Sequence, residues 1–227
     1  MKQLGIMGLI LGFVLGFGVT TDAHTFYDNF NDGNANGWEL LPGARGLPAL
    51  WSVEDGMLVQ AGTDDYITAL VKNLALSDQS IEVQVSTYGY AGVVLWRQDS
   101  SNFVSVSINP VSTGLMIIEG FDGQLNELRY ESRTNALQVY DLRVDADSAT
   151  GQLAVYLDDA YIFTYNTSSP HRTGLSGVFA GNEVGYFDDF SLTSHHVSPV
   201  PEPSTLLLLG SGLGGLGGLA WRKHRRQ

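Results

Sequence analysis

The stretch Ile81–Val85, with the sequence IEVQV, decides the fold class, because apolar and polar side chains alternate strictly along it. A period of two places the apolar side chains on one face of an extended strand, so the stretch is predicted as a β-strand with one buried face. Val104, Val106 and Ile108 alternate with serines in the same way. Helical periodicity is nearly absent between residues 26 and 192, which favours an all-β domain.

Turn residues separate further strands along the chain. Asp55-Gly56 supplies a positive-φ turn between residues 51 and 59, which predicts a β-hairpin. Asp158-Asp159 separates residues 153–157 from residues 161–165 and predicts a second β-hairpin.

Two segments, 92–97 and 115–121, are apolar almost throughout and are predicted as inner strands that are buried on both faces or lie near an edge of the core. With a closing strand over 184–192, the pattern predicts about eleven or twelve short strands. Strands at this spacing indicate a β-sandwich of two antiparallel sheets, a jelly roll.

The C-terminus combines the triplet Pro201-Glu202-Pro203, an apolar run from Thr205 to Trp221 and a basic cluster over 222–227. As a helix the run would be about 25 Å long, enough to cross the hydrocarbon core of a bilayer. The basic cluster is expected to stay in the cytoplasm, which orients the preceding chain outside it. This tail resembles the PEP-CTERM sorting signal, which implies processing near Pro201, Glu202 and Pro203 by an exosortase-type membrane enzyme. A permanent single-span anchor is the alternative.

The N-terminus has the parts of a secretory signal peptide: Lys2, an apolar run over 4–19, and the small residues Thr21 and Ala23. Cleavage is expected after Ala23, and a retained membrane anchor is the alternative. Both ends predict that the chain is exported and anchored in the inner membrane until its tail is processed. It would then reside in the cell envelope or outside the cell.

These features predict five parts in the chain. They are a signal peptide that forms a helix (residues 1–23), a β-sandwich domain (24–196), a Pro-rich linker with the Pro-Glu-Pro triplet (197–204), a transmembrane helix (205–221) and a basic cytoplasmic tail (222–227).

Composition limits the partners of the domain. The chain holds 24 Asp and Glu against 12 Lys and Arg, a formal net charge of −12. An acidic surface repels nucleic acid, so none is expected as a partner. The chain has no cysteine, which excludes disulfides and thiolate metal sites.

A second resemblance covers almost the whole region between the two ends. Its motifs, in chain order, are Phe26–Phe30 with Trp38, Trp51–Leu58, Ala91–Asp99 with Asn102-Phe103, Val155–Asp159 and Tyr186–Phe190. Together they resemble the concanavalin A-like lectin/glucanase jelly roll, which includes laminin-G-like domains. The resemblance implies a sugar-associated fold whose first and last strands are neighbours, often with a structural calcium ion between them.

The carboxylates at those two strands are the candidate calcium ligands. Asp28 and Asp32 lie at the start of the domain, and Asp188 and Asp189 lie at its end. Calcium takes six to eight oxygen ligands, and neighbouring carboxylates repel unless a cation or a proton intervenes. The alternative is that these residues only form solvated turns.

Sugars bind by stacking on aromatic rings, with polar groups fixing their hydroxyls. Five residues on or beside predicted strands could form such a surface if the concave sheet face exposes them: Tyr88, Tyr90, Trp96, Arg97 and Tyr130. The alternative for each aromatic is a place in the core.

No catalytic residue is predicted. The hydrolytic relatives of this fold use a Glu-x-Asp-x-x-Glu-type strand motif, which the chain lacks, and Glu119 with Asp122 reads as a turn. The sequence therefore favours a non-enzymatic, exported module that binds carbohydrate, such as exopolysaccharide. A jelly-roll glycoside hydrolase and a structural or adhesion protein of the matrix remain alternatives.

Overall fold

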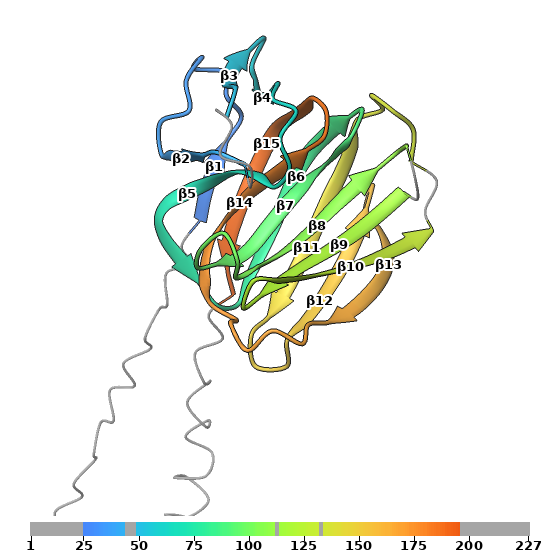
Figure 1. Ribbon diagram of the computed structural model, residues 1–227. Coiled ribbons are helices and arrows are strands. Elements are labelled where there is room, and N and C mark those ends of the chain that lie inside the picture. The colour runs from blue at the N-terminus through green and yellow to red at the C-terminus, as the bar shows by residue number, and fades with distance from the viewer. Residues whose placement is uncertain (1–24, 44–48, 112–113, 132–133, 196–227) are drawn as a thin grey trace, which may run out of the picture.

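The computed structural model describes residues 25–43, 49–111, 114–131 and 134–195. In these ranges the chain forms fifteen strands and no helix, which confirms the predicted all-β class. The strands form two antiparallel sheets that pack face to face as a jelly-roll sandwich (Figure 1). The predicted signal peptide, Pro-rich linker, transmembrane segment and basic tail lie outside the described residues. Within those residues, no helix has the length and apolar character needed to span a bilayer.

Sheet A has eight strands in the order β13-β12-β11-β6-β15-β4-β3, and β1 also pairs with β15. Its strands are β1 (Thr25–Asp28), β3 (Trp51–Glu54), β4 (Met57–Gln60), β6 (Gln79–Thr87), β11 (Tyr140–Asp147), β12 (Gln152–Leu157), β13 (Ala160–Asn166) and β15 (Gly185–Ser194). The pairing of β1 with β15 confirms that the first and last strands are neighbours.

Sheet B has seven strands in the order β10-β9-β8-β7-β14-β5-β2. Its strands are β2 (Trp38–Leu41), β5 (Ile67–Leu76), β7 (Tyr90–Arg97), β8 (Phe103–Asn109), β9 (Gly114–Phe121), β10 (Gln124–Glu131) and β14 (Gly174–Gly181).

The alternation at residues 81–85 has the predicted consequence. Ile81, Val83 and Val85 of β6 are buried in the core between the sheets, whereas Glu82 is exposed. The strands β7 and β9 are buried along almost their whole length, as their continuous apolar character predicts.

Both predicted hairpins are present. Asp55 and Gly56, with φ of 50° and 77°, connect β3 to β4, and Asp158 and Asp159, with φ of 49° and 63°, connect β12 to β13. Asp and Gly tolerate this left-handed region better than other residues, which explains their place in the two turns.

The strand count was predicted too low, because β2, β5, β10 and β14 were not recognised. The strand β14 has the sequence GLSGVFAG, and glycine lowers the propensity for strands. Gly177 is nevertheless required there, because a Cβ atom would collide with the carbonyl oxygen of Ala69 on β5. Close approach of two backbones, which the sequence does not reveal, explains this glycine.

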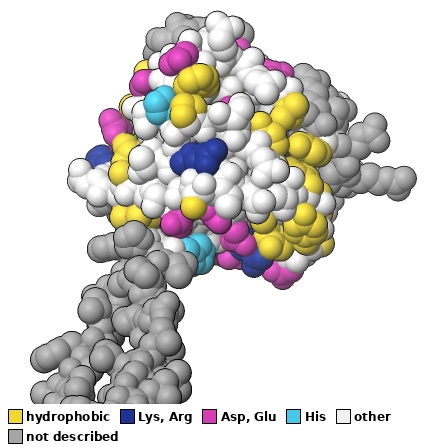
Figure 2. Space-filling view, turned by 90° about the horizontal axis from the view of Figure 1, so that it is seen from below, with side chains coloured by type: hydrophobic (Ala, Val, Ile, Leu, Met, Phe, Trp, Pro, Cys, Tyr) yellow, Lys and Arg dark blue, Asp and Glu magenta, His cyan; other side chains and the backbone are white. Residues whose placement is uncertain are grey.

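Seen from below, the end of the sandwich exposes few Lys and Arg side chains, and hydrophobic side chains gather along one flank (Figure 2). The scarcity of positive charge on this face agrees with the acidic composition of the chain.

Candidate functional site

Sheet B carries a second apolar layer on its outer face, away from the main core. The buried members of this layer are Leu70, Tyr90, Val94, Phe103, Met116, Ile118 and Phe179. Phe179 lies at its centre, with ring centroids 5.7 Å from Tyr90, 6.1 Å from Phe103 and 5.9 Å from Tyr66. An outer sheet face covered by aromatic rings is the kind of surface on which sugars stack.

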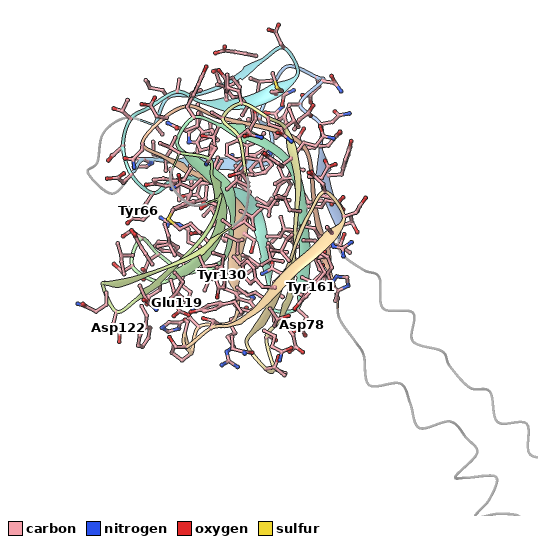
Figure 3. The ribbon with its side chains drawn as sticks, turned by 90° about the vertical axis from the view of Figure 1, so that its right-hand side faces the viewer. Tyr66, Asp78, Glu119, Asp122, Tyr130 and Tyr161 are labelled. Carbon is pink, nitrogen blue, oxygen red and sulfur yellow. The ribbon has the colours of Figure 1, made fainter. Side chains whose placement is uncertain are left out.

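Tyr66 covers part of this layer and lies on the outer side of sheet B (Figure 3). Its φ of 59° is in the left-handed region, which is uncommon and unfavourable for an aromatic residue. Its hydroxyl donates a 3.3 Å hydrogen bond to Oε1 of Glu127 on β10. Such backbone strain is concentrated at functional sites, which makes Tyr66 a candidate binding residue.

Two cavities adjoin one another at this face, because both are lined by Tyr90, Asn109 and Asn182, and Tyr66 lines the smaller one. The smaller cavity, about 370 Å³, is also lined by Asp65, Tyr66, Met116, Ile118 and Glu127. The larger, about 700 Å³, is also lined by Tyr88, Gly89, Val111 and Glu183. We refer to these two cavities together as the groove.

Tyrosine hydroxyls hold two of the carboxylates of the groove. Besides the bond from Tyr66 to Glu127, the Tyr90 hydroxyl donates a 3.0 Å hydrogen bond to Oδ1 of Asp65. Burial, followed by the negative charge of the neighbouring carboxylate, raises the pKa of both tyrosines. Both hydroxyls therefore stay protonated as donors, and the oriented carboxylates and amides can accept or donate hydrogen bonds to a polyhydroxylated ligand.

Tyr88 and Tyr90 are the predicted sugar-binding residues that the structure brings together at the groove. Tyr88 is 47% exposed, whereas Tyr90 is 6% exposed and shows only part of its surface. Tyr130 lies elsewhere: its ring stacks on Phe163 of β13 with a centroid distance of 3.8 Å.

Trp96 is in the core and offers no exposed ring, at 0% exposure. Alternation along β7 would place it on the outer face with Tyr90 and Val94, but its φ of 52° interrupts the alternation. Its ring therefore turns inward, where Nε1 donates a 2.7 Å hydrogen bond to the Ser77 carbonyl oxygen. Arg97 takes the place on the outer side, with its guanidinium carbon 5.9 Å from the centroid of the Phe103 ring.

Three of the predicted calcium ligands, Asp28, Asp188 and Asp189, lie in the paired strands β1 and β15, where Asp28 pairs in register with Phe190, and Asp32 lies in the turn after β1. Asp28 already accepts hydrogen bonds with both carboxylate oxygens, from the Phe30 amide at 2.9 Å and from Trp38 Nε1 at 2.8 Å. Burial, with the negative charges of Asp189 and Asp28, raises the pKa of Asp188.

The two other predicted ligands also have hydrogen-bond partners. Asp32 accepts from the Asn34 amide at 3.1 Å, and Asp189 accepts from the Tyr27 hydroxyl at 2.7 Å. Within the part of the chain that the structure describes, no three His, Cys, Asp or Glu residues are grouped so as to hold a metal ion. The donor set therefore fits a calcium ion only if carbonyl oxygens or water supply further ligands.

Glu119 is not in a turn, as the sequence suggested, but inside β9 at the lower end of the sandwich, 3% exposed (Figure 3). Its carboxylate accepts hydrogen bonds from the hydroxyls of Tyr165, Thr167 and Ser168 and from the Ser169 amide. These bonds occupy both oxygens, which makes Glu119 an anchor for the segment after β13 and not a catalytic acid.

Sequence reasoning missed most of the polar residues of the groove: Asp65, Tyr66, Asn109, Glu127, Asn182 and Glu183. They come from four separate connections and strands, so no local spacing relates them. The run Asp64-Asp65-Tyr66 directly before β5 is the one local signal, because it places acidic and aromatic side chains together at the start of a strand.

Residues 199–226 match the family model described as the PEP-CTERM protein-sorting motif. The chain carries a PEP-CTERM sorting signal. This motif indicates an exported protein whose C-terminus is processed by an exosortase. No curated protein matches the sequence of this chain.

Among solved structures, the chain is similar to the carbohydrate-binding module CBM66 from Bacillus subtilis, with a TM-score of 0.61 and 14% identity over 70% of this chain and 96% of that one. It is also similar to a Bacillus licheniformis β-glucanase, with a TM-score of 0.55 and 13% identity over 76% and 98% of the two chains. The GH43 protein BlXynB from Bacillus licheniformis gives a TM-score of 0.57 and 14% identity, over 74% of this chain and 39% of that one. At such identities the likeness shows the fold alone, a concanavalin A-like jelly roll.

Proposed function

We propose that the jelly-roll domain is a non-enzymatic module that binds carbohydrate, such as exopolysaccharide, in the groove on the outer face of sheet B. The observation that carries the proposal is the combination in the groove of the half-exposed Tyr88, the strained Tyr66 and the amides Asn109 and Asn182. Aromatic surface supplies apolar contact for sugar rings, and the amides and carboxylates match sugar hydroxyls. The similarity of the fold to a carbohydrate-binding module supports the same ligand class.

Binding of soluble polysaccharides can be measured by affinity gel electrophoresis of the full chain in non-ionic detergent. We expect retardation by at least one polysaccharide, and the Tyr88→Ala variant should lose most of it because a 47% exposed ring is removed. Tyr161→Ala is the matched control, because Tyr161 is 58% exposed but lies on β13 of sheet A. Equal retardation of both variants would contradict the proposed site.

A glycoside hydrolase is the second candidate, because Asp65 and Glu127 line the same cavity. Glycosidases need two carboxylates on either side of the scissile bond, one of them protonated. Release of reducing sugar that is abolished by both Asp65→Asn and Glu127→Gln would establish hydrolysis. Unchanged release in these variants would exclude this pair.

We further propose that the predicted N-terminal signal peptide directs export and that the apolar run over 205–221 anchors the chain in the inner membrane. The exosortase would cleave near Pro201-Glu202-Pro203 and pass the domain to the envelope or the exterior. The PEP-CTERM motif supports this order of steps, and immunoblotting of membrane and secreted fractions tests it. Full-length chain found in the cytosol would contradict it.

We also propose that a calcium ion binds beside Asp28 and Asp188, where it would offset the burial and the neighbouring negative charges that together raise the pKa of Asp188. Its ligand set would be completed by Asp32 or Asp189 and by carbonyl oxygens or water.

A further inference from the structure

Arg97 is a largely buried cation that has no hydrogen-bond acceptor. The residue is 8% exposed, and among the described residues its environment consists of burial and the charges of Asp99 and Glu39, with no hydrogen bond from the guanidinium. The guanidinium carbon lies 5.9 Å from the centroid of the Phe103 ring, which is a cation–π contact. Burying a charge without a hydrogen-bonded partner is costly, so its retention calls for an explanation.

The nearby acidic residues do not neutralise Arg97 by direct contact. Asp99 is the closest in sequence, but its two oxygens accept hydrogen bonds from the Asn102 side chain at 3.0 and 2.9 Å, and one also accepts from the Ser101 amide at 2.7 Å. The charges of Asp99 and Glu39 raise the pKa of the guanidinium, but they do not offset the desolvation by burial that lowers it.

The guanidinium is nevertheless not completely sealed from solvent. Several buried polar atoms of the described residues lack both solvent contact and a hydrogen-bond partner, and the nitrogens of Arg97 do not belong to this group. It lies on the outer side of sheet B, because Phe103 belongs to the apolar layer of that face. Along β7, Arg97 is seven residues from Tyr90 of the groove, a separation of about 20 Å at the rise of a strand.

We infer that Arg97 binds the carboxylate of an acidic sugar, so that the bound polysaccharide contains uronic-acid residues. This inference rests on the proposed function of the groove and adds the substrate class to it. A planar guanidinium with free donors matches a carboxylate in a bidentate fork, which a neutral sugar cannot supply. The two ends of the face then differ, since Asp65 and Glu127 line the groove at the Tyr90 end. The Tyr90 end of the face would therefore prefer sugar hydroxyl groups and the Arg97 end a sugar carboxylate. This difference would orient the bound polysaccharide.

The net charge of −12 does not exclude such a ligand. Repulsion between exposed charges is largely screened beyond about 8 Å at physiological ionic strength, whereas a partly buried pair is screened much less. A short-range contact at Arg97 can therefore outweigh the long-range repulsion.

Affinity electrophoresis of the full chain in detergent, with polygalacturonate and with its carboxyl-reduced, neutral form, tests the inference. We expect the wild type to bind polygalacturonate at least tenfold more tightly than the neutral polymer. Arg97→Gln should remove this difference by weakening the binding of polygalacturonate toward that of the neutral polymer. Arg97→Lys, which keeps the charge but not the fork, should retain part of it.

Arg143→Gln is the matched control, because Arg143 is an arginine that lies on sheet A. Its Nε is 3.6 Å from Oδ2 of Asp145, and its guanidinium carbon is 3.9 Å from the centroid of the Tyr156 ring. Arg143→Gln should bind both polymers like the wild type, and thermal melting verifies that each variant is folded. Equal binding of the two polymers by the wild type, or an unaltered preference in Arg97→Gln, would overturn the inference and leave the proposed function intact. Failure to bind either polymer or any other polysaccharide would overturn both.

Discussion

At the scale of single residues, Glu119 shows how one buried carboxylate fixes a connection. It accepts hydrogen bonds from Tyr165, Thr167, Ser168 and Ser169, so the segment after β13 is tied to the lower end of β9. Burial alone would raise the pKa of Glu119, but the hydrogen bonds outweigh it and the pKa lies below its ordinary value of 4.5. The ionised form is therefore the one that stabilises the fold.

Replacing Glu119 by Gln should lower the free energy of unfolding by about 1–3 kcal/mol, because an amide cannot accept all four bonds. The contribution of the ionised carboxylate is present above about pH 4.5 and is lost as the pH falls through the lowered pKa. Denaturant unfolding at pH 7 and at pH 4 should show that the difference between wild type and variant shrinks in acid. Glu54→Gln, at an exposed position, should change stability by less than about 0.5 kcal/mol. An equal effect of both changes would contradict the anchoring role.

Asp188 has the opposite effect on how stability depends on pH. Its pKa is raised above the ordinary value of 3.8, so its contribution to stability is present below that pH and is lost as the pH rises through the raised pKa. At pH 7, in the presence of a chelator, Asp188→Asn should therefore have a higher melting temperature than the wild type.

Calcium should raise the melting temperature of the wild type more than that of Asp188→Asn. At a concentration a hundredfold above the dissociation constant, the stabilisation would be about 2.7 kcal/mol. If the wild type melts at the same temperature with calcium and with chelator, the proposed calcium site is contradicted.

At the scale of the strands, alternation predicted β6 but not the end of β7. Periodicity of two would place Trp96 on the outer face and Arg97 in the core. The positive φ at Trp96 interrupts this alternation, so Trp96 lies in the core and Arg97 on the outer side. The pairing of β7 with its neighbour β14 shifts in register at this irregularity, since Leu175 pairs with Arg97 but Gly177 pairs with Val94. Such bulges arise from the fit between neighbouring strands, so a pattern within one strand cannot reveal them.

Gly92 of β7 tests how closely the strands of sheet B approach. A Cβ atom there would collide with the carbonyl oxygen of Val106 on β8. Gly92→Ala should therefore destabilise the fold by about 3 kcal/mol, measured by denaturant unfolding.

Gly123→Asn is the control for Gly92, because nothing lies within 4 Å of the Cβ position and asparagine tolerates its φ of 76°. This change should cost less than about 1 kcal/mol. A Gly92→Ala variant as stable as the control would show that the strands can separate there without loss.

At the scale of the whole molecule, the sequence was sufficient for the sorting signal and for the β-sandwich, because both depend on local patterns. The Pro201-Glu202-Pro203 triplet with its apolar and basic continuation is a contiguous signal, and alternation within single strands determines the fold class. The groove could not be predicted, since Tyr66, Asn109, Glu127 and Asn182 meet only after both the strand order and the turns are fixed.

Processing of the sorting signal can be tested in the producing cell. Replacing Glu202 by Ala should make the full-length chain accumulate in the membrane fraction, because the exosortase motif is altered. Immunoblotting against the domain detects the change in size and in fraction. Unaltered processing would show that the triplet is not needed for cleavage.

The central claim is that carbohydrate binds the outer face of sheet B and not that of sheet A. Nuclear magnetic resonance of the chain with labelled tyrosine rings, titrated with an oligosaccharide from the polysaccharide it retains, tests this most directly. We predict that the signals of Tyr66 and Tyr88 shift on titration, while those of Tyr27 and Tyr161, which are 57% and 58% exposed on sheet A, do not. Shifts confined to Tyr27 and Tyr161 would contradict the account.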